Sequence, residues 1–256
     1  MKKLVGVSAI AAFAFVGAAN AADMPVKAQP ITPAPVIYNW SGFYVGATAG
    51  YNRGKADITY SPASFLVPAD VTAISAQGSP SLSSNSFTGG VELGYNAQWN
   101  QLVAGIVSDF QYIGLKASAG GTFATPSAGP HVMNTEVKAD WLVTLRGRVG
   151  YAFDRTLLYA TGGLAVSNIS FSQSDAFLGS TDAFSISKTK AGWTVGGGVE
   201  YALPDRWSLR AEYLYVDLGH VGGPSTFTFA LVPFATAYDA RVRDNIVRLG
   251  VSYKLN

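Results

Sequence analysis

Eight charged side chains inside otherwise alternating, hydrophobic stretches are the residues of this chain best suited to chemistry. Four are arginines and four are acids, so their charges balance: Arg146, Arg148, Arg210, Arg248, Glu92, Asp109, Glu200 and Glu212. A guanidinium group pairs with a carboxylate through two parallel hydrogen bonds, which accounts for the absence of lysine from these positions. We expect these side chains to meet in a buried ion-pair network. The alternative is that they line a narrow conduit and set its solute preference.

Other kinds of reactive site have little support in the residues. Cysteine is absent, which excludes thiol catalysis, disulfide bonds and cysteine-ligated metal. The formal net charge is only +2 and no basic stripe is present, so nucleic acid is not an expected partner. The glycine-rich stretches Thr161–Gly163 and Gly196–Gly198 precede no lysine and open no helix, so they do not predict phosphate loops. We expect no enzymatic activity, no metal site and no cofactor.

Proline positions indicate which elements carry the charges. All 12 prolines fall outside eight stretches in which apolar and polar residues alternate with period 2. Proline cannot donate to a β ladder, so it is excluded from interior strand positions. Each stretch is long enough to cross a bilayer, which takes about 9–11 residues in a tilted strand. The predicted strands are 41–52, 85–98, 102–114, 137–153, 156–170, 189–203, 207–219 and 241–255.

The connections between these strands alternate between short and long. The short turns are Asn100-Gln101, Asp154-Arg155 and Pro204-Asp205-Arg206. The long connections are rich in Ser, Thr, Ala, Gly and Pro, which is typical of mobile loops, and they are 53–84, 115–136, 171–188 and 220–240. Short turns at one end and long loops at the other predict an all-β, eight-stranded, antiparallel transmembrane barrel of up-and-down topology. Its turns and both chain ends would lie on the periplasmic side.

Alternation gives most strands one apolar and one polar face. Val143 and Leu145, for example, alternate with Thr144 and Arg146. The third and fifth strands are mixed, so the pattern does not fix their faces or the orientation of Asp109. A barrel of eight strands is just wide enough to be filled by its own side chains, which favours a closed network over a conduit.

Period-2 alternation also fits a soluble, lipocalin-like barrel with an apolar interior. Four features favour lipid contact instead. Charged residues are only 13% of the chain, the polar face is mostly Gly, Ser, Thr and Asn, and every lysine lies in the leader, the tether, a loop or near a strand end. Aromatic rings, which prefer membrane interfaces, gather at both ends of the strands. Those expected at the periplasmic rim are Trp40, Phe43, Trp99, Phe153, Tyr201, Trp207 and Tyr253, and those at the outer rim are Phe87, Tyr112, Trp141, Trp193 and Tyr215.

The N-terminus reads as an export signal peptide. Lys2 and Lys3 precede a mostly apolar segment, and Ala19-Asn20-Ala21 supplies the small-x-small cleavage pattern. We predict a signal peptide over 1–21, with Ala22 as an alternative cleavage site, a Pro/Ala-rich periplasmic tether over 22–39, and a barrel over 40–256. The predicted location is the cell outer membrane.

Several stretches resemble one family of proteins. WSGFYVGATAGYN (40–52) follows an Ala/Pro tether and a leader ending in ANAAD, and later strands read DWLVTLRGRVGYAF, LLYATGGLAV, AGWTVGGGVEYAL and WSLRAEYLYVDLG. Together they resemble the alphaproteobacterial outer-membrane β-barrel family, labelled porin-like, immunogenic or hemin-binding. The resemblance spans the chain and implies a barrel similar to the membrane domain of outer membrane protein A. One departure is the end, Tyr253-Lys254-Leu255-Asn256, which lacks the terminal aromatic residue that the insertion machinery reads.

The resemblance makes His131 and His220, the only histidines, candidate haem ligands, with solvated loop histidines as the alternative. We expect a structural or surface-exposed role, with outer-membrane lipid as partner and a lumen closed by ion pairs. The alternatives are a narrow porin for small solutes and a loop-borne receptor for haem or a host surface. The sequence indicates no oligomeric state.

Overall fold

The structure is a computed structural model that describes residues 38–62, 67–127, 129–177, 180–229 and 231–256. The predicted signal peptide, 1–21, lies outside the described residues. So does all of the predicted tether, 22–39, except its last two residues.

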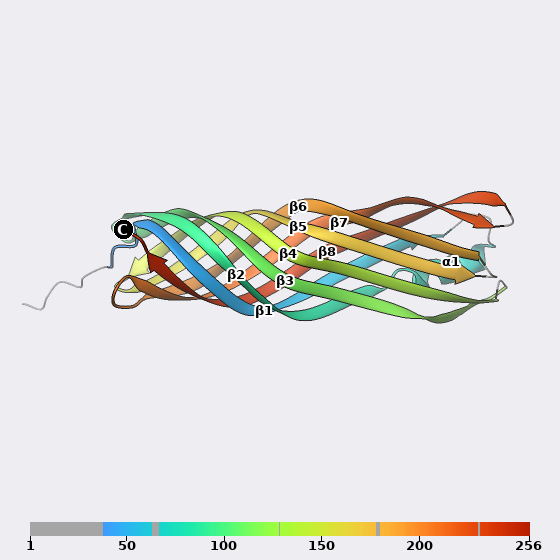
Figure 1. The fold of residues 1–256 in the computed structure, drawn as a ribbon, viewed down its shortest axis with the longest axis horizontal. Helices are drawn as coiled ribbons and strands as arrows, with labels where there is room; N and C mark the ends of the chain where they lie inside the picture. Colours follow the sequence, from blue (N-terminus) through green and yellow to red (C-terminus); the bar gives the residue numbers. More distant parts are fainter. Residues whose placement is uncertain (1–37, 63–66, 128, 178–179, 230) are drawn as a thin grey trace, which may run out of the picture. The chain divides into compact units, whose positions relative to one another are not determined.

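Eight antiparallel strands form a closed barrel, in which each strand pairs with the next along the chain and β8 pairs with β1 (Figure 1). The predicted fold class is confirmed. The strands are β1 (Gly42–Ser61), β2 (Ser81–Trp99), β3 (Leu102–Thr125), β4 (Gly129–Phe153), β5 (Thr156–Phe177), β6 (Ser180–Ala202), β7 (Trp207–Phe229) and β8 (Val232–Lys254). The Leu255 N–H donates to the Phe43 carbonyl at 2.9 Å, so the start of β1 and the C-terminus meet at one end, which we call the proximal end.

The three predicted tight turns join strands at the proximal end and are confirmed. Asn100, Asp154 and Asp205 adopt φ angles of 54°, 49° and 58°. Asn and Asp tolerate this left-handed conformation better than other residues with a side chain, which explains their use here.

The prediction of four long loops is wrong. The strands run for 19 to 25 residues, about twice the length needed to cross a bilayer, and most of the predicted loop residues belong to them. The strand pattern continues past the predicted boundaries, but there most inward-facing residues are apolar and most outward-facing ones are polar. Because of this reversal and the many small polar residues, these segments have the composition of loops.

Three prolines, Pro130, Pro224 and Pro233, lie within strands, contrary to prediction. Each pairs with only one neighbouring strand: Pro130 with β3, Pro224 with β8 and Pro233 with β7. The missing N–H is tolerated because these are edge positions, where no second ladder needs it.

The barrel changes its filling halfway along. On β8, inward-facing Arg248 gives way to inward-facing Val242 and Tyr238, while outward-facing Leu249 gives way to Arg243. The border is marked by the outward-facing residues Tyr51, Phe87, Tyr112, Trp141, Val166, Trp193, Tyr215 and Val247. We call the part between the proximal end and this border the proximal half, and the strands beyond it, with the helix between β1 and β2, the distal extension.

The distal extension consists of two four-stranded sheets. Pairing between β2 and β3 ends at Gly89 and Tyr112, and pairing between β6 and β7 ends at Trp193 and Asp217, whereas the other pairings continue. Strands β7, β8, β1 and β2 therefore form one sheet and β3 to β6 the other. We call the two openings the β2–β3 seam and the β6–β7 seam. The facing sides enclose an apolar core that includes Ile58, Tyr60, Ile113, Val137, Ile169, Phe171, Leu218, Tyr238 and Val242.

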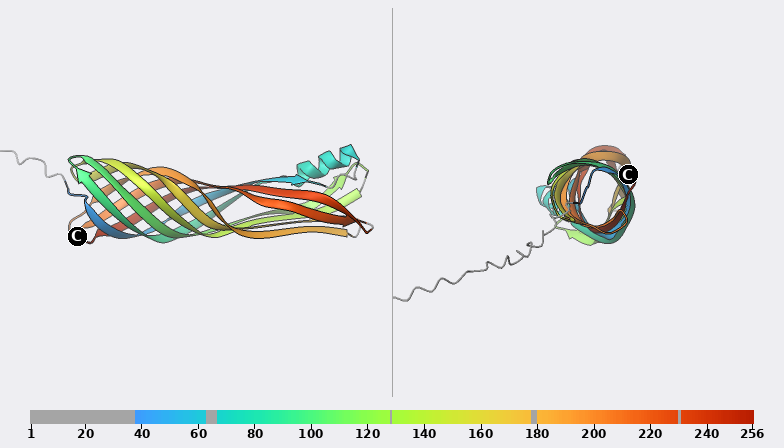
Figure 2. Two further views of the ribbon diagram at one scale, coloured as in Figure 1. Left: turned by 90° about the horizontal axis from the view of Figure 1, so that it is seen from above. Right: turned by 90° about the vertical axis from the view of Figure 1, so that its left-hand side faces the viewer.

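The helix α1 (Pro68–Gln77), which the sequence did not predict, lies at the distal end of the barrel (Figure 2). Ile74 is buried in the distal core. The Asp70 carboxylate accepts from the Ser127 N–H at 3.0 Å, and Gln77 Oε1 lies 2.7 Å from His131 Nε2. Because α1 follows β1 and contacts residues next to β3 and in β4, it joins the two sheets.

Trp40 was predicted among the lipid-facing aromatic residues of the periplasmic rim, but it lies inside the proximal mouth. Its side chain is 4% exposed and packs in a cluster with Leu157 and Tyr159. Trp40 precedes β1, so strand alternation does not direct it outward. The backbone N–H of Trp40 donates to Gln98 Oε1 at 2.6 Å, which fixes the chain across the opening.

Candidate functional site: the charged layer of the proximal half

All eight charged residues singled out from the sequence lie inside the proximal half. Each is at most 5% exposed. The structure also fixes the faces that alternation left open: Asp109 points inward on β3, and Tyr159 and Thr161 point inward on β5. The strands therefore direct every one of these charges toward the barrel axis.

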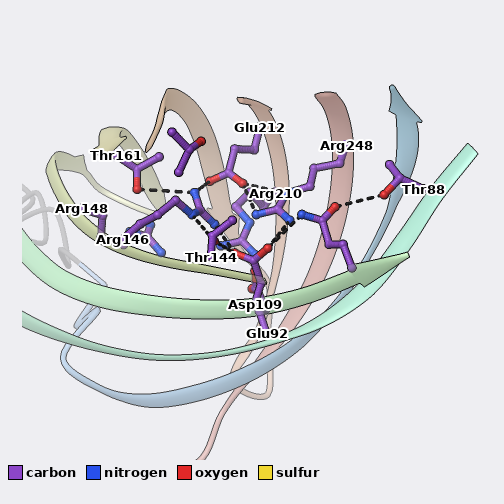
Figure 3. Close-up of polar contacts among 12 residues, drawn as sticks. Thr88, Glu92, Asp109, Thr144, Arg146, Arg148, Thr161, Arg210, Glu212 and Arg248 are labelled. Carbon is purple, nitrogen blue, oxygen red and sulfur yellow. Dashed lines mark hydrogen bonds and ion pairs between the residues drawn. The ribbon is translucent and has the colours of Figure 1, made fainter. Parts of the chain in front are cut away.

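Four of the charges form a closed ring of alternating sign (Figure 3). Arg146 Nη2 lies 2.7 Å from Asp109 Oδ2, and Arg146 Nη1 lies 3.1 Å from Glu212 Oε1. Arg248 Nη1 lies 3.1 Å from Asp109 Oδ1, and Arg248 Nε donates to Glu212 Oε2 at 2.8 Å. Arg248 Nη2, 2.5 Å from the same oxygen, makes an ion-pair contact without hydrogen-bond alignment. We call these four residues the central ring; they come from β3, β4, β7 and β8.

The other four charges form two pairs beside the ring. Arg148 Nη2 donates to Glu200 Oε2 at 2.8 Å, and the Arg148 guanidinium lies 4.1 Å from the centre of the Tyr159 ring. Arg210 pairs with Glu92. Because each pair joins strands that are not neighbours, β4 with β6 and β7 with β2, the side chains cross the interior.

Neutral residues complete the layer, and sequence reasoning did not single them out. The Thr144 hydroxyl donates to Asp109 Oδ2 at 2.6 Å, and the Tyr159 hydroxyl donates to Glu212 Oε1 at 2.8 Å. Gln111 Nε2 donates to Asp109 Oδ1 at 2.8 Å. Thr144 stood on a recognised polar face and could have been found, whereas Gln111 and Tyr159 belong to the two strands whose faces were open.

The layer is electrically neutral, which is the condition for burying so many charges. An isolated buried ion costs several kcal/mol, whereas a paired and hydrogen-bonded one recovers much of that cost. The carboxylates are held by guanidinium groups and hydroxyls, which suits a structural layer better than a reactive one. Within the described residues, no group of three or more His, Asp or Glu side chains is placed to hold a metal ion.

The two histidines lie in strands, not in the predicted loops. His131 is on β4 and 1% exposed; Nδ1 lies 2.9 Å from Asp175 and Nε2 lies 2.7 Å from Gln77. In this arrangement both ring nitrogens are occupied by protein. His220 is on β7, its side chain is 61% exposed, and its Nδ1 lies 2.6 Å from Asp239 Oδ1.

No helix in the described part of the chain is both long and apolar enough to span a membrane.

The family model described as the outer membrane protein beta-barrel domain matches residues 8–254. The chain belongs to this family. Among its relatives, the 31 kDa outer-membrane immunogenic protein of Brucella melitensis is 37% identical over 99% of this chain and 100% of that protein. The 22 kDa outer membrane protein of Rhizobium leguminosarum is 32% identical over 88% of this chain and 81% of that protein. The crystal structure of Neisserial surface protein A matches with a TM-score of 0.40 and 22% identity, over 84% of this chain and 98% of that one.

As an outer-membrane β-barrel, the protein places the apolar outer face of its proximal half in lipid. Exposed aromatic residues border this band on both sides, among them Trp99 and Phe153 at the proximal end and Phe87 and Trp193 at the border. Such girdles are typical of the two interfaces of a membrane barrel. Tight turns of these barrels typically face the periplasm, so the proximal end is the one expected on that side.

Proposed function

We propose that this protein is a non-conducting outer-membrane barrel that carries a rigid β-structured extension at the cell surface. The observation that supports this most is the filling of the barrel along its whole length. The cluster around Trp40 fills the periplasmic mouth, the charged layer fills the middle, and the apolar core of the distal extension fills the outer part. A continuous water path would have to cross all three.

The extension supports a role in presenting a surface. Its inward side chains are packed as in a soluble protein interior, with Phe171, Val137 and Val242 fully buried. Its outward face is polar, and it is built from paired strands. The name of the Brucella relative calls that protein immunogenic. For this chain, we propose that the extension is the part accessible from outside. The proposal includes no catalytic step.

Single-channel recording tests the closed lumen. The mature chain, folded in vesicles and checked by its faster gel migration before boiling, is fused with a planar bilayer. We expect no resolvable conductance steps. A variant with Ala in place of all four residues of the central ring is expected to stay closed, because the layers on either side remain. Conductance of the unmodified protein with a cation preference that changes in Arg210→Gln would refute the proposal and favour the conduit.

Haem binding at the cell surface is a second candidate, favoured by the geometry of His220. A metal-binding histidine usually donates its other ring N–H to a carboxylate, which fixes the tautomer and orients the ring. Nδ1 of His220 lies 2.6 Å from Asp239 Oδ1 on an exposed side chain, so Nε2 is the nitrogen that would ligate iron. Haem titration followed by the Soret band tests this. His220→Ala should abolish binding and Asp239→Asn should weaken it, whereas equal affinities in all three proteins would remove His220 from consideration.

A further inference from the structure

Basic residues are confined to three levels of the barrel. Apart from Lys2, Lys3 and Lys27, the lysines and arginines of the chain lie in the charged layer, at the proximal end or just beyond the border. Those at the proximal end are Arg155, Arg206 and Lys254. Those just beyond the border, which we call the basic belt, are Arg53, Lys55, Lys116, Lys138, Lys188, Lys190, Arg241 and Arg243. Further out the extension has no lysine or arginine, since 56–115, 117–137, 156–187 and 211–240 contain none.

The basic belt follows the outer aromatic girdle on four strands, β1, β3, β4 and β6, and follows Val247 on β8. Arg53 is two residues beyond Tyr51 on the outward face of β1, whereas Lys190 is three residues from Trp193 and on the opposite face of β6. If these cations served only solubility, they would be spread over the whole polar surface of the extension. Their confinement to one level indicates an anionic partner at that level.

Acidic residues offset the repulsion between neighbouring cations in part of the basic belt. Lys116 and Lys138 are directly opposite each other on β3 and β4, a pairing that is unfavourable for like charges. Glu136 lies between them, 3.5 Å from Lys116 Nζ and 2.5 Å from Lys138 Nζ. On β1, Asp57 pairs with Lys55 and with Arg243 in the same way.

Three cations of the basic belt have no such partner. The side chains of Arg53, Lys188 and Lys190 form no ion pair or hydrogen bond with any residue that the structure describes. Lys188 and Lys190 lie on the β6 side of the β6–β7 seam, where β6 has lost its pairing with β7. Both start from the inward face of β6, the face of Thr194 and Ile186, and the open seam leaves Lys188 exposed and Lys190 half-buried, within reach of a molecule at this opening.

The lipid-facing surface below the belt has room for acyl chains. A groove of about 610 Å³ runs over β6, β7, β8 and β1 in the proximal half, where the small residues Ala47, Ala49 and Ala211 line it. It lies on the strands that carry Arg53 and Arg243 further out. Going outward along the barrel, the apolar groove corresponds to the acyl chains of a lipid, the aromatic girdle to the membrane interface, and the cations to the phosphate groups.

We propose that the basic belt binds the phosphate groups of an anionic glycolipid of the outer leaflet, with its acyl chains against the apolar face of the proximal half. Lysine and arginine near a membrane surface recognise anionic head groups in this way. The inference goes beyond the proposed function and does not depend on whether the lumen conducts.

Native mass spectrometry of the mature chain in a neutral detergent tests the inference, with diphosphoryl lipid A as the probe. We expect it to bind at least tenfold more tightly than lipid A from which both phosphates have been removed. The variant Arg53→Gln, Lys188→Gln, Lys190→Gln should lose at least tenfold in affinity, since one cation near an anionic surface is worth about fivefold. It disturbs no ion pair among the residues that the structure describes, and its gel migration before boiling checks that it folds.

The control variant is Arg155→Gln, Arg206→Gln, Lys254→Gln, which removes the same charge at the periplasmic end. Its affinity should change less than twofold. Inorganic phosphate at the same phosphate concentration should not compete; full competition would show that free phosphate is the ligand and would overturn the lipid assignment. Equal affinities in the two variants would also overturn it. If the belt variant self-associates and its lipid affinity is unchanged, the role of the lysines is to prevent association at the open strand edge, and the proposal is wrong.

Discussion

The central ring makes a quantitative prediction about the energy that couples its members. Glu212→Gln leaves Arg146 and Arg248 to share the one carboxylate of Asp109, and Arg248→Gln leaves Asp109 and Glu212 to share the guanidinium of Arg146. Removing one partner of a buried pair costs about 3–5 kcal/mol, because an uncompensated charge stays behind. Each single variant should lose about that much stability.

The double variant should lose no more than either single one. With Glu212 and Arg248 both neutral, the ring reduces to Asp109 and Arg146, which lie 2.7 Å apart and balance each other. The costs of the single changes then do not add, and the coupling energy should be about 3–5 kcal/mol.

Reversible urea unfolding in phospholipid vesicles, followed by tryptophan fluorescence, measures these differences. Gel migration before boiling reports the folded fraction. The matched control is the exposed pair Lys55 and Asp57, 3.2 Å apart, whose coupling should stay below about 1 kcal/mol. Additive losses for Glu212→Gln and Arg248→Gln would refute the closed ring, because independent sites add and members of one network do not.

Three further predictions concern the distal extension. Phe171→Ala should lower the free energy of unfolding by about 3–5 kcal/mol, measured in urea, because its ring is fully buried. Gly222→Ala should raise proteinase K cleavage of the extension, because an added Cβ would lie 2.0 Å from the Tyr238 carbonyl oxygen; unchanged cleavage would contradict the close approach of β7 and β8. Burial raises the pKa of the Asp244 carboxyl from 3.8 to about 7, although the hydrogen bond from Asn52 lowers it. The free energy of unfolding should therefore be greatest below about pH 4 and fall as the pH rises to about 7. Asp244→Asn should remove this fall and be more stable above pH 7, by up to about 4 kcal/mol, in urea titrations at several pH values.

The topology could be predicted from the sequence because its determinants are local. Period-2 alternation located the eight strands, and Asn100, Asp154 and Asp205 marked the turns through their tolerance of left-handed backbone. The charged layer could also be predicted, because charged side chains on strands that pack together have to face one another. The individual ion pairs could not be predicted, because Arg146 and Glu212 are brought together by closure of the barrel and not by sequence spacing.

The distal extension was missed because its pattern is the reverse of that in the membrane. Ala56, Ile58 and Tyr60 alternate with polar residues as strand residues do, but they continue the polar face of β1, not its apolar face. If only one face is followed along the chain, the strand ends where the filling of the barrel changes. The surroundings of His131 were also out of reach, because α1 supplies Gln77 from 54 residues away.

The replacement of loops by paired strands at the outer surface bears on how antibodies would recognise this protein. Each patch of the extension is assembled from neighbouring strands, such as β2 and β1 or β6 and β5, whose contacting residues lie apart in the chain. Short synthetic peptides reproduce single strands and not such patches. Immunisation with the folded barrel should therefore raise sera that bind intact cells but no longer bind the protein after it has been boiled.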